Sequence, residues 1–131
     1  MRLYNKKQID NYIEQLLKLN WNKYSLYLIG GALHKNKTKD IDVCIVGPHD
    51  SKAIFELMEN SMKLGPFDLY FCDYDQINKP KPYMAKSRDR GHSKAKQRKG
   101  EWINELFWQH LDFSSKNFNL KPLLIHRGSG S

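Results

Sequence analysis

The stretch LIGGALHKNKTKDIDVCIVG, residues 28–47, decides how this sequence can fold. It begins with the end of an apolar run that stops at two adjacent glycines, Gly30 and Gly31. A lysine-rich loop follows, and the next apolar run opens with Asp40 and Asp42 on alternate positions. Acidic residues are poor strand formers, and two of them on one strand face repel each other. The arrangement therefore needs a partner that compensates the negative charge.

Hydrophobic periodicity predicts the elements on either side of this stretch. Apolar residues at i, i+3, i+4, i+7 and i+8 spacing indicate a helix over 6–20, and similar patterns indicate helices over 52–64, capped by Asp50 or Ser51, and over 101–111. Short apolar runs bounded by glycine and proline indicate strands over 25–29, 40–47, 66–73 and 121–126. The order predicts one α/β (α+β) domain over residues 1–127, with a small mixed sheet of three to four strands and flanking helices. The final GSGS, residues 128–131, is interpreted as an added linker outside the fold.

The net charge of +8 is concentrated in one segment. Residues 79–100 carry nine basic side chains and one acid, Asp89, whereas the rest of the chain carries thirteen charges of each sign. This tract has no apolar periodicity and two X-Pro steps, so it predicts a long flexible loop that attracts phosphates. The alternative is a solvated loop that only aids solubility.

The sequence shows no run of eighteen apolar residues and no signal-peptide pattern, so no membrane contact is expected. Cys44 and Cys72 have no CxxC spacing and lie in apolar runs, which is typical of buried, reduced thiols. A cytoplasmic protein is the expectation.

Three acids are the candidate catalytic and metal-binding residues. Side chains alternate along a strand, so Asp40 and Asp42 face the same way, and Asp68 interrupts the apolar run of a later strand. If the two strands share a sheet in suitable register, the three carboxylates converge and predict a site for two Mg²⁺ ions, with Mn²⁺ as a possible substitute. Asp73 and Asp75 are rival third acids, but Asp73 lies on the opposite strand face and Asp75 in the turn that follows.

The glycines and lysines before these acids predict a phosphate site. Gly30 and Gly31 lack Cβ, so their backbone N–H groups can approach a phosphate closely. Lys35, Lys37 and Lys39 in the loop can neutralise a triphosphate.

Together these residues resemble the nucleotidyltransferase superfamily, which shares the fold of DNA polymerase beta, and in particular its minimal members. The shared pattern is an apolar residue and two glycines, a loop of eight residues here, an acid-apolar-acid-apolar run and a later acid. The matching positions are Ile29, Gly30, Gly31, Asp40, Ile41, Asp42, Val43 and Asp68. The resemblance covers residues 8–73.

The resemblance implies a metal-dependent enzyme that transfers a nucleoside monophosphate from an NTP such as ATP to a hydroxyl, with pyrophosphate leaving. It implies that Gly30 and Gly31 hold the β- and γ-phosphates, that Asp40 and Asp42 ligate both ions, and that Asp68 completes the catalytic metal and helps to deprotonate the attacking hydroxyl.

The basic tract favours an RNA or another nucleic-acid end as the acceptor. Its candidate binding residues are Lys86, Arg88, Arg90, Lys94, Lys96, Arg98 and Lys99. Larger members of the superfamily add a helical region for the acceptor that has no counterpart here, so a homodimer or a partner chain is expected to complete that site. The alternatives are nucleotidylation of a protein side-chain hydroxyl and a non-catalytic basic protein that binds nucleic acid.

Overall fold

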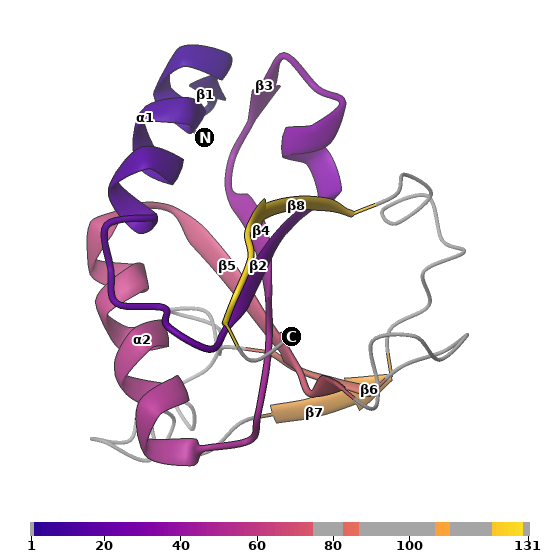
Figure 1. Cartoon of the computed structure of the whole chain (residues 1–131). Coiled ribbons are helices and arrows are strands. Elements are labelled where there is room, and N and C mark those ends of the chain that lie inside the picture. Colours follow the sequence, from indigo (N-terminus) through magenta and orange to yellow (C-terminus); the bar gives the residue numbers. More distant parts are fainter. Residues whose placement is uncertain (1, 75–82, 87–106, 111–121, 130–131) are drawn as a thin grey trace.

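The computed structural model describes residues 2–74, 83–86, 107–110 and 122–129, and these residues form a mixed α+β structure (Figure 1). The helices are α1 (Lys6–Leu16), α2 (Ser51–Leu64) and the short 3₁₀ helix η1 (Gly30–Leu33). The strands are β1 (Tyr4–Asn5), β2 (Ser25–Ile29), β3 (Lys37–Thr38), β4 (Ile41–Val46), β5 (Phe67–Cys72), β6 (Tyr83–Lys86), β7 (Phe107–His110) and β8 (Leu123–His126). The α/β (α+β) class predicted from the sequence is confirmed.

The main sheet has the strand order β7-β6-β5-β4-β2-β8, and β1 and β3 form a separate two-stranded ribbon. Within the main sheet, β4 and β5 are parallel and every other neighbouring pair is antiparallel. A parallel pair needs a crossover connection, which α2 provides. A mixed sheet is therefore present as predicted, with its parallel pair at the centre, but in the described part of the chain it has six strands rather than three to four.

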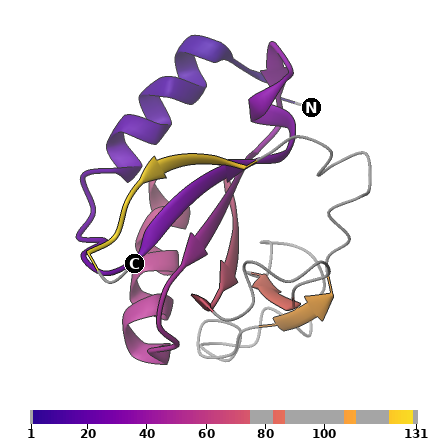
Figure 2. The same cartoon turned by 45° about the vertical axis from the view of Figure 1, so that its right-hand side comes forward.

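Both helices cover one face of this sheet, as Figures 1 and 2 show from two directions. The core between helices and sheet takes alternate residues of β2, β4 and β5, including Ile41, Val43 and Ile45 of β4. Four residues on the opposite face of β4 and β5 form a second apolar cluster with Ile29: Cys44, Val46, Tyr70 and Cys72. Every residue of β5 is buried, so the strand is covered on both faces.

Both helices begin at a residue whose side chain satisfies a free backbone N–H group. The Asn5 Oδ1 accepts from the Gln8 N–H at 2.9 Å, and the Gln8 Oε1 accepts from the Asn5 N–H at 2.9 Å, which is a capping box. The Asp50 carboxylate accepts from the Ala53 N–H at 3.2 Å, so the predicted Asp50 cap of α2 is confirmed.

Two strands occupy positions where the sequence pattern predicts other structure. Residues 83–86 form β6 inside the tract predicted to be a loop, and residues 107–110 form β7 inside the segment predicted to be a helix. The two strands pair with each other, and β6 also pairs with β5. Phe107 and Trp108 are aromatic residues that favour strands, and ladder hydrogen bonds override a weak helical periodicity. The remaining residues of both predicted segments lie outside the described part of the chain.

The C-terminal residues also differ from expectation. The Gly128 N–H donates to the Ser25 Oγ at 2.8 Å, and the Ser129 N–H donates to the Asn22 carbonyl at 3.1 Å. Gly128 is buried and lies so close to Lys23 that a Cβ there would overlap the Lys23 carbonyl oxygen. Gly128 and Ser129 are therefore part of the fold rather than a linker outside it.

Candidate metal centre

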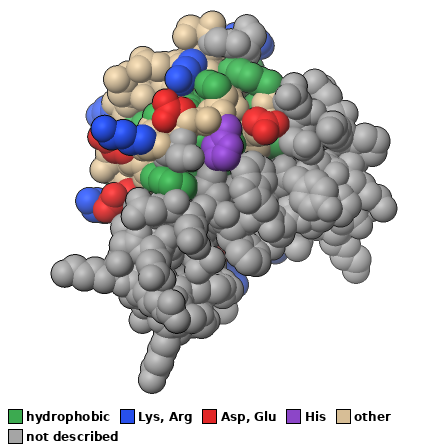
Figure 3. Space-filling view, turned by 90° about the horizontal axis from the view of Figure 1, so that it is seen from below, with side chains coloured by type: hydrophobic (Ala, Val, Ile, Leu, Met, Phe, Trp, Pro, Cys, Tyr) green, Lys and Arg blue, Asp and Glu red, His purple; other side chains and the backbone are tan. Residues whose placement is uncertain are grey.

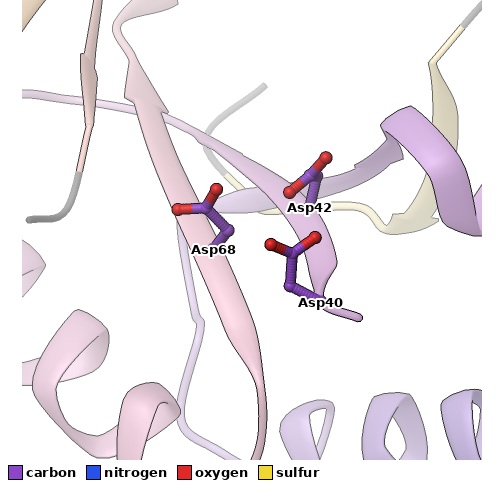
Figure 4. Close-up of side chains that lie close together, drawn as sticks. All are labelled: Asp40, Asp42 and Asp68. Atoms are coloured by element: carbon purple, nitrogen blue, oxygen red, sulfur yellow. The ribbon is translucent and has the colours of Figure 1, made fainter. Parts of the chain in front are cut away.

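Two adjacent strands bring the three predicted acids together. In the parallel β4–β5 pair, Asp42 lies opposite Asp68, and Asp40 precedes Ile41, the first residue of β4. One carboxylate oxygen of each acid lies within 4.8 Å of the other two. Figure 4 shows the three side chains pointing toward one another. The predicted convergence is confirmed.

The three carboxylates differ in burial. Asp68 is only 7% exposed, whereas Asp40 and Asp42 are half-buried. The second apolar cluster lies on the same sheet face, next to the acids. Its residues Cys44 and Tyr70 lie opposite each other, two residues beyond Asp42 and Asp68 along β4 and β5. Charges interact more strongly beside apolar groups than in water, so the three carboxylates together attract a cation.

The oxygens of the three acids suit a hard divalent ion. Mg²⁺ and Mn²⁺ prefer carboxylate oxygens and are usually held by a few of them together with water and substrate phosphate. The donor set therefore fits the Mg²⁺ predicted from the sequence, with Asp40, Asp42 and Asp68 as the residues that would hold it. The rival Asp73 follows the end of β5 and is not in the cluster, and Asp75 lies outside the described residues.

Gly30 has a structural role that its sequence context does not reveal. Its φ is +69°, a conformation that favours glycine, and a Cβ at this position would overlap the Asp42 Oδ2. The neighbouring Ile29 is also the residue of β2 that lies opposite Asp42. The absence of a side chain at Gly30 therefore lets the Asp42 carboxylate lie directly against the backbone turn.

The predicted triphosphate lysines all lie at the surface. Lys35 is exposed, and its Cδ would lie 3.6 Å from a Cβ at Gly31, so its stem runs beside the second glycine. Lys37 in β3 and Lys39 before Asp40 are exposed as well. Lys35 is thereby placed beside the glycine turn, and none of the three lysines forms an ion pair within the described residues.

Thr38 is a site-proximal residue that the lysine spacing does not reveal. It is 8% exposed, although it lies between the two exposed lysines Lys37 and Lys39. Threonine is more often exposed than buried, so the sequence carries no signal for the burial of Thr38.

The predicted nucleic-acid-binding residues are almost all outside the described chain. The backbone of Lys86 lies in β6, opposite Tyr70 of β5 and Phe107 of β7. The others, Arg88, Arg90, Lys94, Lys96, Arg98 and Lys99, lie outside the described residues.

We expect the two thiols of the sheet to be inert. Both cysteines are free and buried; burial raises the pKa of Cys44 well above its usual value, and burial followed by the nearby Asp73 raises the pKa of Cys72 to about 12. At pH 8, folded protein should therefore react with iodoacetamide far more slowly than urea-unfolded protein. Equal rates would contradict this burial.

The same shifts predict a loss of stability at alkaline pH. The unfolded thiols ionise near pH 9 and the folded ones only at higher pH, so the stabilising contribution is complete below about pH 8.5 and lost as pH rises toward 12. The free energy of unfolding, measured with urea at pH 8 and pH 10, should fall, and Cys72→Ala should reduce the fall.

The coloured surface seen from below in Figure 3 carries acidic and basic side chains interspersed, without a broad patch of either sign. Among the described residues, Lys23 and Asp50 form an ion pair whose charged groups lie 3.9 Å apart. In the described part of the chain, neither helix has the length and hydropathy needed to cross a bilayer.

No family model, curated protein or solved structure matches this chain. The chemistry of the site therefore has to be inferred from its own residues.

Proposed function

We propose that this chain is a metal-dependent nucleotidyltransferase of the minimal type, which transfers a nucleoside monophosphate from an NTP to a hydroxyl. One observation carries the proposal: three carboxylates from β5 and from the start of β4 meet within 4.8 Å, directly beside the Gly30 turn at the end of β2. A metal site alone needs the acids, and a phosphate site alone needs the turn. Their contact favours a ligand that has both, which is a metal-bound triphosphate.

Each residue has a distinct role in this proposal. The Gly30-Gly31 turn and the ammonium group of Lys35 hold the β- and γ-phosphates, with Lys37 and Lys39 adding positive charge. Asp40 and Asp42 would hold two Mg²⁺ ions, and Asp68 would hold one of them. The bound ions would neutralise charge on the reacting phosphoryl group.

The chain's own groups then handle the acceptor. Asp68 accepts the proton of the acceptor hydroxyl while the hydroxyl oxygen bonds to the α-phosphorus of the NTP. The bond between the α-phosphorus and the oxygen that bridges it to the β-phosphorus breaks, and pyrophosphate is released. Most of the rate enhancement comes from positioning and charge stabilisation, as in phosphoryl transfer generally.

The acceptor in this proposal is an RNA or another nucleic-acid end, because the whole charge surplus of the sequence lies between residues 79 and 100. The cytoplasm is the proposed compartment, since Cys44 and Cys72 are free thiols.

The direct test is incubation with each of the four α-³²P-labelled NTPs, Mg²⁺, and either pooled RNA or cell extract. Label that moves to RNA with release of pyrophosphate supports the proposal. Label that moves to protein shows that the acceptor is a protein side chain rather than a nucleic acid. If no label moves with any NTP in Mg²⁺ or Mn²⁺, the proposed activity is wrong. The Asp42→Asn variant controls for a contaminating enzyme.

The acceptor predicts a salt dependence that the basic tract controls. If about four of its cations contact phosphates of a single strand, log K should fall with log salt with a slope of roughly −3. Replacing Lys94, Lys96, Arg98 and Lys99 with alanine should flatten that slope and weaken RNA binding, because those contacts are lost. NTP affinity should stay nearly unchanged. Filter binding of a labelled RNA at several salt concentrations measures the RNA affinity of the wild type and of the variant. Salt-independent binding by the wild type would contradict a nucleic-acid acceptor.

A further inference from the structure

Asp40 is the one acid of the metal centre that lies outside a strand ladder. β4 begins at Ile41, so Asp42 and Asp68 are held by sheet pairing on a rigid frame, whereas Asp40 sits in the bend before it. Since a metal ligand must be held within a fraction of an ångström, something other than the sheet has to fix Asp40.

Two hydrogen bonds bracket the Asp40 backbone. On one side, the Ile41 N–H donates to the Pro66 carbonyl at 2.8 Å. On the other side, the Thr38 Oγ1 donates to the Asp40 carbonyl at 2.9 Å. The first bond anchors the start of β4 to the chain entering β5, and the second closes the bend that carries Asp40.

Thr38 is itself held from two directions. Its backbone pairs with Tyr4 in the β1–β3 ribbon, and the Tyr4 ring packs edge-on against Tyr12 of α1 with 5.5 Å between ring centroids. On the opposite side, a Cβ at Gly31 would lie only 3.3 Å from the Thr38 Oγ1. The N-terminal strand, the glycine turn and the first acid therefore meet at one buried hydroxyl.

We propose that Thr38 is a positioning residue of the metal centre: its hydroxyl fixes the bend so that the Asp40 carboxylate faces Asp42 and Asp68, and the N-terminal ribbon supports it. This inference rests on the proposed function, because it assumes that the three acids hold a divalent ion. Residues that orient metal ligands typically change metal affinity by one to two orders of magnitude when they are altered.

The test compares Thr38→Val with Thr38→Ser in direct binding of Mn²⁺, followed by electron paramagnetic resonance. Valine keeps the shape of threonine but removes the hydroxyl, and it should weaken Mn²⁺ binding about tenfold. Serine keeps the hydroxyl and should bind within about twofold of the wild type. Thr38→Ala, which removes the hydroxyl without adding a methyl group, gives a second variant if the valine protein does not fold.

Ser61→Ala is the matched control. The Ser61 Oγ donates to the Leu57 carbonyl at 2.6 Å, and Ser61 is fully buried in α2, away from the acids. Ser61→Ala therefore removes a hydrogen bond from a side-chain hydroxyl to a backbone carbonyl, as Thr38→Val does. Both Thr38→Val and Ser61→Ala should lower the melting temperature, but only Thr38→Val should lower Mn²⁺ affinity.

The outcomes separate this inference from the proposal beneath it. If the wild type binds no Mn²⁺, the metal centre and the role of Thr38 are both wrong. If the wild type binds Mn²⁺ and Thr38→Val binds it equally well, or if Thr38→Ser loses as much affinity as Thr38→Val, only the role of Thr38 is wrong.

Discussion

Asp42→Asn should reduce nucleotidyl transfer by roughly a thousandfold while the protein stays folded. Asparagine keeps the shape of the side chain but removes the charge that holds the metal. Because Asp42 lies within 4.8 Å of two other acids, removing its charge relieves repulsion in the metal-free protein. The free energy of unfolding, measured with urea, should therefore be equal to or higher than that of the wild type, and single-turnover kinetics with labelled NTP would measure the loss of rate.

Asp40→Asn should behave like Asp42→Asn, whereas Asp68→Asn should lose chemistry but keep most of the affinity for NTP with Mg²⁺. The surface residue Asp10 of α1 is exposed, and Asp10→Asn is the matched control for charge alone. Near wild-type turnover of Asp42→Asn in Mg²⁺ would rule out the assignment. Equal loss of NTP binding in all three acid variants would rule out the separate role of Asp68.

Gly30→Ala should lose metal binding and destabilise the protein by about 3 kcal/mol. Two causes add here: a positive φ of +69° is strained for alanine, and the new Cβ would overlap the Asp42 Oδ2. The Asp42 carboxylate must then leave its present position in the metal centre. Urea denaturation and Mn²⁺ titration measure the two effects separately.

Two further variants identify the cause. Gly31→Ala should be milder, because Gly31 has no positive φ and its Cβ would meet Thr38 Oγ1 at 3.3 Å, a tight contact rather than an overlap. In an Asp42→Ala background the carboxylate is absent, so Gly30→Ala should cost less stability than it does in the wild type. The same cost in both backgrounds would show that backbone strain, not the carboxylate, makes Gly30 necessary.

Periodicity was sufficient to predict most of the central fold. The helical spacing of Ile9, Ile13 and Leu16 and the short apolar runs around Asp42 and Asp68 each indicate an element that packs by its own pattern, and α1, β4 and β5 follow. The strands β6 and β7 could not be predicted this way, since β6 depends on pairing with β5 and β7, and β7 depends on pairing with β6. Their stability comes from ladder hydrogen bonds between distant segments, which a local pattern does not contain.

The sequence likewise indicates the candidate residues of the site but not their placement relative to one another. Alternation along a strand is enough to place Asp40 and Asp42 on one face, but the register that sets Asp42 beside Asp68 of the next strand is a tertiary property. Gly30 shows the limit clearly. Its sequence context suggests close approach of a phosphate, whereas its contact with Asp42 appears only when β2 and β4 are seen together.

The burial of β5 on both faces constrains how the length of this chain can vary during evolution. Leu69 and Phe71 are fully buried beneath the helices, and Asp68, one residue before Leu69, lies on the opposite face. Inserting or deleting a single residue in β5 ahead of Asp68 would turn its carboxylate into the apolar layer under α2 and turn leucine and phenylalanine out beside Asp42. Insertions and deletions in descendants of this sequence should therefore occur mainly in surface turns, because within β5 only the insertion or deletion of two residues keeps each side chain on its own face.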